Sequence, residues 1–174
     1  MIYRLVFTLI FSFFTQVGWS LNYTECSYQA IQRLDLDSDK FVERHNYYRQ
    51  KLGIAAVKWN EELAEYAAQW AKRLALRCEL KHRSTHEYGE NIYYFSGKAD
   101  EFQVVDYWAE EEKYFNHKKP IYDKKRGKLY GHYSQVIWAN STDIGAAAYQ
   151  CKNGGQIWVC NYNPPGNWIG KRVY

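Results

Sequence analysis

Few residues in this chain could carry acid–base or metal chemistry, and one glutamate interrupts an apolar pattern. Phe102, Val105, Trp108 and Phe115 recur at helical spacing, and Glu111 falls on the same stripe. A carboxylate buried there would need an ion pair, hydrogen bonds or a metal ion, because burial disfavours its charge. Periodicity alone slightly favours a place at the edge of the stripe, from which Glu111 reaches water. Glu111 is therefore a candidate site residue with two open interpretations.

His82 and His86 have the i, i+4 spacing of a zinc-binding pair on a helix, although the polar run and Gly89 favour a loop. The metalloprotease pattern His-Glu-x-x-His is incomplete, because His86-Glu87-Tyr88-Gly89 is not followed by a second histidine. No Gly-x-Ser-x-Gly elbow is present to activate a serine. The cysteines are expected in disulfides, which leaves no thiolate nucleophile. The common hydrolase motifs are therefore missing.

The elements that must position these residues are helices early in the chain and strands late, an order that favours an α+β domain. Asn60 is expected to cap the second helix, and Ser38 or Asp39 the first. In the strand expected after Gly131, His132, Ser134, Val136 and Trp138 would share one face. The predicted helices are 39–52, 61–77 and 100–115, and the predicted strands are 131–138, 144–150 and 156–162.

The N-terminus has the pattern of a secretory signal, with a cationic residue, an apolar run and small residues at a cleavage site. The apolar run of about ten residues is too short to span a bilayer, which takes about 20. Cleavage after Ser20 is predicted, followed by an arm at 21–38 and a single domain at 39–174. The expected product is a secreted, extracellular protein with no transmembrane segment.

The net charge is +4, and basic residues cluster in the second half of the chain. A solvated loop is the favoured interpretation, because a secreted protein rarely meets nucleic acid. No nucleic-acid partner is predicted, while attraction to anionic lipid or glycan is an intermediate case. The clustered residues are Lys118, Lys119, Lys124, Lys125, Arg126 and Lys128.

Four motifs in order resemble the signatures of the CAP superfamily of cysteine-rich secretory, antigen 5 and pathogenesis-related class-one proteins. The resemblance spans Asp39 to Trp168 and is strongest to the venom-allergen-like proteins of parasitic worms. It implies a three-layer α-β-α sandwich, in which His45 and Arg49 have structural roles and the histidine is buried and hydrogen-bonded. The motifs are His45-Asn46-Tyr47-Tyr48-Arg49, Gly89-Glu90-Asn91-Ile92, Gly131-His132-Tyr133-Ser134-Gln135-Val136-Ile137-Trp138 and Cys160-Asn161-Tyr162-Asn163-Pro164-Pro165-Gly166-Asn167-Trp168.

The resemblance also implies a central cavity lined by His82, Glu90, Glu111 and His132. His82 follows Cys78 in the family's Cys-x-Leu-x-His pattern, but Arg83 replaces the usual serine, so His86 is a rival. Two imidazoles and two carboxylates suit Zn²⁺ or another divalent cation, which folding is not expected to require. They also suit acid–base catalysis, or a hydrogen-bonded network with neither metal nor reaction.

Four cysteines behind a secretory signal predict two disulfides, with three possible pairings. Cys151 and Cys160 flank the turn Lys152-Asn153-Gly154-Gly155, and both their separation and the family favour that pair. Cys26 and Cys78 would then pair by elimination. Asn22 and Asn140 begin tripeptides that can accept glycans.

Relatives in the family include binders of sterols and fatty acids, which implies a small lipid as a partner. The loop assigned to sterol binding corresponds here to residues 114–122, whose aromatic ends surround a basic middle. The favoured hypothesis is a non-enzymatic lipid-binding effector at a host interface. The alternatives are a metal-dependent hydrolase using the four cavity residues and a ligand for a host protein. The loop residues are Tyr114, Phe115, Pro120 and Tyr122.

Overall fold

The computed structural model describes residues 31–85, 87–123 and 125–174. The predicted signal sequence and most of the predicted arm lie outside these residues, as do Asn22, Cys26 and His86. Within the described ranges, no helix is both long enough and apolar enough to cross a membrane.

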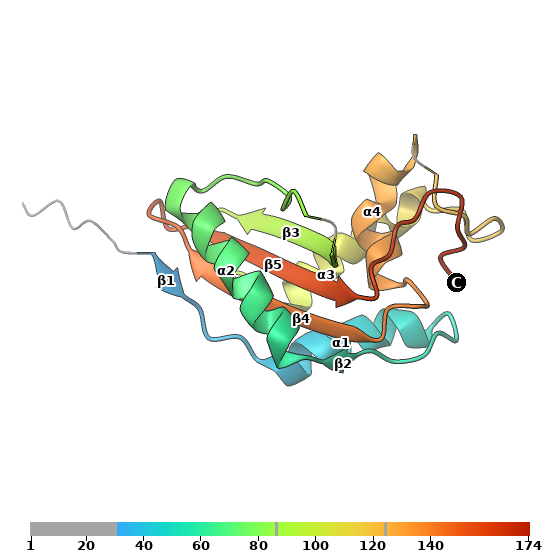
Figure 1. The fold of residues 1–174 in the computed structure, drawn as a ribbon, viewed down its shortest axis with the longest axis horizontal. Coiled ribbons are helices and arrows are strands. Elements are labelled where there is room, and N and C mark those ends of the chain that lie inside the picture. The colour runs from blue at the N-terminus through green and yellow to red at the C-terminus, as the bar shows by residue number, and fades with distance from the viewer. Residues whose placement is uncertain (1–30, 86, 124) are drawn as a thin grey trace, which may run out of the picture.

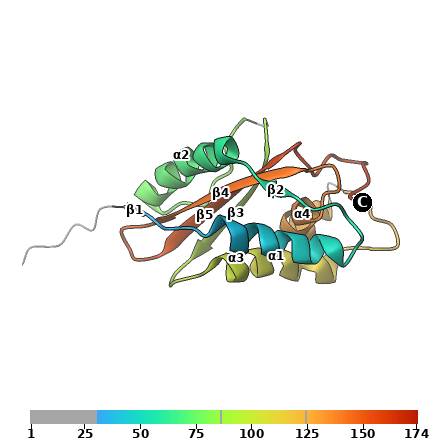
Figure 2. The same ribbon diagram turned by 90° about the horizontal axis from the view of Figure 1, so that it is seen from below.

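The described chain forms three layers, with a sheet between helices (Figures 1 and 2). Helix α2 (Glu61–Arg77) covers one face of the sheet, and α1 (Ser38–Gln50) and α3 (Glu101–Ala109) cover the other. Helix α4 (Gly127–Val136) lies at one end, beside the C-terminal segment (Figure 1). The predicted α+β class and three-layer sandwich are confirmed.

The described strands form one five-stranded sheet in the order β1-β4-β5-β3, with neighbours antiparallel along this path. Strand β2 adds in parallel to the start of β4, at the opposite end from β1. The strand at 89–95 was not predicted, because its buried and part-buried positions do not alternate. The strands are β1 (Gln32–Arg33), β2 (Lys58–Trp59), β3 (Gly89–Phe95), β4 (Asp143–Gln150) and β5 (Gln156–Asn163).

Two helix starts show how local sequence sets the elements. The Asn60 side chain accepts from the backbone N–H of Leu63 and caps α2 as predicted. The cap of α1 is Asp37, which accepts from the backbone N–H of Lys40, so the prediction of Ser38 or Asp39 was wrong by one or two residues. Short polar side chains are adjacent there, and the backbone geometry selects the one that reaches the free amides.

The predicted strand at 131–138 was wrong, because most of this segment is the second half of α4. Tyr130, Tyr133, Ser134 and Ile137 are all buried, at spacings of three and four that define one helical face. Drawn as a strand, the same stretch would put polar and apolar residues on both faces, so it lacks the alternation of a half-buried strand. Packing against the end of α3 decides in favour of the helix, which places His132 on α4.

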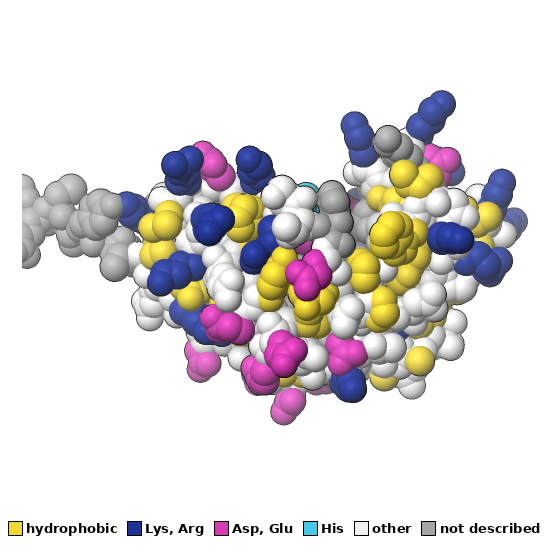
Figure 3. All heavy atoms as spheres, viewed as in Figure 1, with side chains coloured by type: hydrophobic (Ala, Val, Ile, Leu, Met, Phe, Trp, Pro, Cys, Tyr) yellow, Lys and Arg dark blue, Asp and Glu magenta, His cyan; other side chains and the backbone are white. Residues whose placement is uncertain are grey.

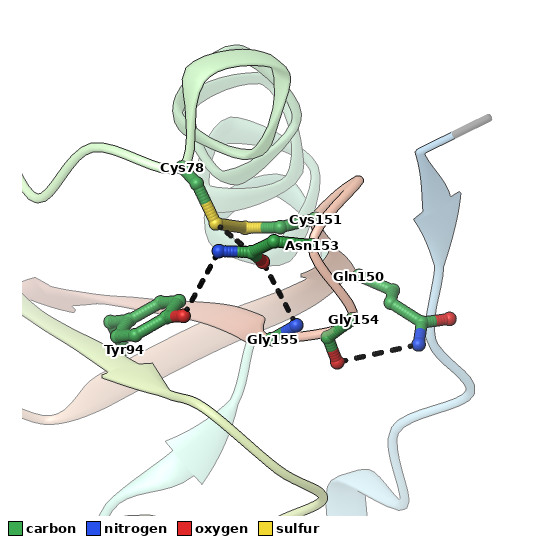
Figure 4. Close-up of a disulfide and its surroundings, with 7 residues drawn as sticks. All are labelled: Cys78, Tyr94, Gln150, Cys151, Asn153, Gly154 and Gly155. Carbon is green, nitrogen blue, oxygen red and sulfur yellow. Dashed lines mark hydrogen bonds between the residues drawn. A yellow bond between two sulfur atoms is a disulfide. The ribbon is translucent and has the colours of Figure 1, made fainter. Parts of the chain in front are cut away.

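The predicted disulfide pairing was also wrong. Cys78, at the end of α2, is bonded to Cys151, at the turn between β4 and β5, with Cα atoms 5.6 Å apart (Figure 4). This bond excludes both predicted pairs, Cys151–Cys160 and Cys26–Cys78. Cys160 is a free, buried thiol.

The sheet itself explains why Cys151 cannot reach Cys160. Cys151 packs in the apolar cluster under α2, whereas Cys160 packs with Trp108 on the opposite face. Cys160 also lies opposite Ala146 in the strand register. Cys151 is five positions along the chain from Ala146, so their Cα atoms are roughly 16 Å apart. A disulfide needs Cα atoms within about 7 Å.

Candidate functional site

One histidine–glutamate pair joins the connection after α2 to strand β3. His82 lies in that connection, and Glu90 is the second residue of β3. His82 Nδ1 donates to Glu90 Oε1 over 2.7 Å, and the backbone N–H of Arg83 donates to the same oxygen over 3.1 Å. The carboxylate thus orients the ring and places a proton on Nδ1, so Nε2 carries the lone pair when the ring is neutral.

A second pair joins the 3-10 helix η1 (Glu110–Tyr114), which continues α3, to α4. His132 Nδ1 donates to Glu111 Oε1 over 2.7 Å. The backbone N–H groups of His132 and Tyr133 donate to Glu111 Oε2 over 2.8 and 3.2 Å. The side chain of Glu111 is 22% exposed, so it sits at the edge of the apolar stripe, and both of its oxygens accept hydrogen bonds.

The position of Glu111 follows from a break in α4. Tyr130 leaves the helical conformation, with φ −141° and ψ 18°. The amides just beyond such a break lack their intrahelical acceptors, as they do at a helix start. Glu111 accepts from two of them and so acts as a cap supplied by another element. The same carboxylate therefore begins the second half of α4 and orients the His132 ring.

Both pairs line one cavity of about 240 Å³, which we call the tetrad cavity. It lies where β3, η1, α4 and the loop after α2 meet. The Nε2 atoms of His82 and His132 have no hydrogen-bond partner among the residues that the structure describes. The rival His86 lies outside the described residues. The site thus presents two imidazoles, each held by a carboxylate on its far side.

The two carboxylates differ in what they leave unpaired. Both oxygens of Glu111 accept hydrogen bonds. Glu90 accepts only through Oε1. Its side chain is 9% exposed, and Oε2 is buried without a hydrogen-bond partner in the described chain. A buried oxygen without a partner is costly, so Oε2 is the atom most in need of a water or a ligand.

The imidazoles and carboxylates fit a divalent cation by their chemistry, since histidine nitrogen suits Zn²⁺ and the carboxylates have the usual orienting role. Across residues 31–85, 87–123 and 125–174, no three His, Cys, Asp or Glu side chains lie close enough together to hold a metal ion. A metal in the tetrad cavity would therefore take its protein ligands from the two imidazoles and complete its coordination with water.

A chain of buried hydrogen bonds connects α1 to the tetrad cavity. His45 Nδ1 donates to Phe41 O, and Nε2 accepts from the Tyr162 hydroxyl over 2.9 Å. The Asn91 amide donates to that hydroxyl and to the backbone carbonyl of His132, both over 3.1 Å. Complete burial lowers the pKa of His45 to about 4, so its ring is neutral at physiological pH. His45 is thus buried and hydrogen-bonded, as predicted.

Arg49 is fully buried and binds the backbone at the end of α4. Its guanidinium donates to the carbonyls of Val136, Trp138 and Ser141 there, and also to that of Ala55 in the loop after α1. These carbonyls include ones that a helix end leaves unpaired, and the positive charge complements the helix dipole. Burial lowers the pKa of Arg49 to about 10, which still leaves it charged.

The aromatic residues of the predicted lipid loop mostly face inward. Phe115 and Pro120 are buried, Tyr122 is half-buried, and Tyr114 is 44% exposed. Phe115 packs edge-on against the ring of Tyr130. Lys and Arg side chains project from the outer edge of the lobe that carries α4 (Figure 3). The loop therefore presents charge outward and keeps its rings below.

Asn140 is exposed on the turn that follows α4, a position open to a glycan. The other predicted acceptor, Asn22, is outside the described part of the chain.

The sequence matches the profile of the cysteine-rich secretory protein (CAP) family over residues 42–162. Pathogenesis-related protein 1C of Nicotiana tabacum is 40% identical over 135 residues, which cover 77% of this chain and 79% of that protein. Pathogenesis-related protein PR-1 of Medicago truncatula is 31% identical over 173 residues, covering 97% and 95%. The chain therefore belongs to the CAP family.

Solved structures show the same fold. The structure of BmVAL-1 has a TM-score of 0.70 at 20% identity and covers 79% of this chain and 81% of that one. The crystal structure of NaASP2 with Zn²⁺ has a TM-score of 0.68 at 22% identity and covers 79% and 84%. At these identities the likeness to venom-allergen-like proteins concerns the fold, whereas the relatives at 31–40% identity named above are plant proteins.

Proposed function

We propose that this CAP domain is a secreted, non-enzymatic binding protein that takes a divalent cation such as Zn²⁺ between His82 and His132. One observation carries the proposal: both rings are held through Nδ1 by carboxylates and line one cavity with Nε2 uncommitted. Such carboxylate–histidine pairs raise the basicity of the ligating nitrogen and set its direction. NaASP2, a protein of the same fold, has a crystal structure with Zn²⁺.

The hydrogen bonding of Glu111 favours a positioning role for this residue over a role as general base. A general base needs a lone pair directed at the proton that it removes. Glu111 accepts hydrogen bonds from the His132 ring and from the backbone N–H groups of His132 and Tyr133. These bonds involve both carboxylate oxygens and hold α4 in place. Glu111 is therefore assigned to positioning His132.

We expect the wild-type protein, stripped with EDTA, to bind one zinc ion with affinity of micromolar order, because two imidazoles make a sparse ligand set. Replacing His132 by alanine should weaken binding at least about tenfold, and Glu111→Gln should weaken it by about 10-fold or more through the loss of orientation. Isothermal titration with ZnCl₂ measures both effects.

His117→Ala is the matched control, because His117 contacts Glu112 and Tyr174 rather than the tetrad cavity. It should leave zinc affinity unchanged. Stoichiometric zinc binding that persists in the double variant His82→Ala/His132→Ala would contradict the proposed site.

A second candidate function is lipid binding, which a separate cavity favours. About 630 Å³ of space lies between the segment before α4 and the C-terminal segment. Its lining combines the apolar Phe115, Ile121 and Tyr130 with the basic Lys119 and Arg126. Its volume is within the range of small-molecule pockets. Apolar walls beside cations suit a fatty acid better than a neutral sterol.

We therefore expect labelled palmitate to bind saturably, and more tightly than labelled cholesterol. Arg126→Ala should weaken palmitate binding about tenfold by removing charge from the cavity. Lys128→Ala, which removes an exposed charge outside the lining, should change it little. Equilibrium binding with radiolabelled lipids measures these effects. If neither lipid binds saturably, lipid binding is ruled out.

A further inference from the structure

A groove runs beside the tetrad cavity and opens to solvent. It has a volume of about 390 Å³ and is bordered by the loop after α2, the start of β3 and the segment at 165–168. We call it the Trp168 groove. In Figure 3 hydrophobic side chains gather along the hollow between the body carrying α2 and the lobe carrying α4. The groove shares His82, Glu90 and Asn167 with the tetrad cavity, so the two spaces adjoin.

Two residues that line this groove each carry a polar atom without a partner, one an acceptor and the other a donor. Glu90 Oε2 and Arg83 Nε are buried, and neither has a partner in the described ranges. Each residue is also held by a bond elsewhere: Glu90 Oε1 accepts from His82, and Arg83 Nη2 donates to the Tyr66 carbonyl over 2.7 Å. Both residues are thus held in position while each keeps an unpaired polar atom.

Arg83 is fixed from two sides. Its guanidinium carbon lies 3.8 Å from the centre of the Tyr66 ring and 5.3 Å from that of Trp70. A guanidinium stacked on aromatic rings loses little further entropy when it binds a ligand. The donor direction of Nε is therefore set before any ligand arrives.

Trp168 provides an apolar surface on the rim. It is 56% exposed, although its indole N–H donates to the Pro165 carbonyl over 2.9 Å. Its one polar atom is thus satisfied, and the ring is held while its surface remains in water. Trp168 and its neighbour Ile169, which is 62% exposed, thus leave apolar surface beside residues that carry unpaired polar atoms.

From these three features we propose that the Trp168 groove binds a neutral saccharide. A sugar hydroxyl both donates and accepts, so neighbouring hydroxyls can serve Glu90 Oε2 and Arg83 Nε together. The C–H face of a pyranose ring can lie on Trp168. An anionic ligand is disfavoured, because it would meet the Glu90 carboxylate in a partly buried setting. The assignment does not require a metal ion and goes beyond the function proposed above.

The test is calorimetric titration with maltohexaose, cellohexaose, chitohexaose and mannohexaose, each in EDTA and again with zinc. At least one sugar should bind saturably below about 10 mM in EDTA. Trp168→Ala should weaken that binding about tenfold, and Arg83→Lys, which keeps the charge but removes Nε, should weaken it several-fold. Tyr107→Ala is the matched control, because Tyr107 is a similarly exposed aromatic residue on α3.

Binding of none of the four sugars would overturn the proposal, as would binding that Trp168→Ala leaves unchanged. An uncharged, acetylated tetra-alanine amide is titrated in parallel. If it bound in the Trp168 groove and the sugars did not, the groove would be a peptide site. Saturable sugar binding in EDTA by a protein that fails to bind zinc would leave this proposal standing while the metal proposal fails.

Discussion

Replacing Arg49 by lysine is expected to lower the free energy of unfolding by about 3 kcal/mol. The guanidinium spans carbonyls at the end of α4 and in the loop after α1, and it is fully buried. Lysine keeps a positive charge but offers one compact donor group in place of the planar fork. Several buried carbonyls would then lack a hydrogen-bond donor, and the buried positive charge would lack acceptors. Both losses lower the free energy of unfolding.

Urea denaturation at neutral pH measures this loss. Arg44→Lys is the matched control, because Arg44 is also on α1 but pairs with Asp106 near the surface, where the side chains are 26% and 37% exposed. A part-exposed pair contributes roughly 0–1 kcal/mol, so the control should stay close to wild type. Equal losses in the two variants would show that the carbonyl network at α4 has no special weight. Because Arg49 also positions the helix that carries His132, Arg49→Lys should weaken zinc binding too.

Removing the Cys78–Cys151 disulfide is expected to have the largest effect on stability. The bond joins residues 73 apart in sequence, and closing a loop of that length contributes about 4 kcal/mol in the chain-entropy account. The double variant Cys78→Ala/Cys151→Ala should therefore show a correspondingly lower unfolding free energy. Denaturation of the wild type with and without reductant should reproduce the difference.

The control is Cys160→Ala, which removes a buried free thiol and only leaves a small cavity, with an expected loss of about 1 kcal/mol. Burial raises the pKa of the Cys160 thiol, so it should resist alkylation until the protein unfolds. Peptide mapping without reduction tests the pairing directly. A linked peptide containing Cys151 and Cys160 would refute the bond described here.

Local patterns predicted the elements whose signals are unambiguous. The bounds of α2 and its Asn60 cap were predicted correctly, because seventeen residues with one apolar stripe leave no rival period. The β4–β5 hairpin was also predicted to within a residue at each end, since a glycine turn separates two apolar runs. The short β1 and β2 and the edge strand β3 carry no such signal, because their pairing partners lie far away in the chain.

The residue types of the site were inferred from motifs, but the roles of their atoms were not. Sequence could nominate Glu90 and Glu111 as equivalent acids. The two carboxylates differ in which oxygens are bonded by backbone amides. Two amides of α4 donate to Glu111 Oε2, whereas the amide of Arg83 donates to Glu90 Oε1, the oxygen that His82 also uses. Arg83 and Trp168 escaped notice as binding residues for the same reason, because only the assembled groove leaves them with open groups.

By itself, the amino-acid sequence determined the class of fold, the helices α1, α2 and α3 and the family, since composition, periodicity and short motifs are properties of neighbouring residues. Only the tertiary structure decided that His132 lies on a helix, that Cys78 reaches Cys151, and that Glu90 keeps a free oxygen. These outcomes depend on which face of the sheet a side chain occupies and on contacts between layers. Segments far apart in the chain set those relations, and a local pattern carries no information about them.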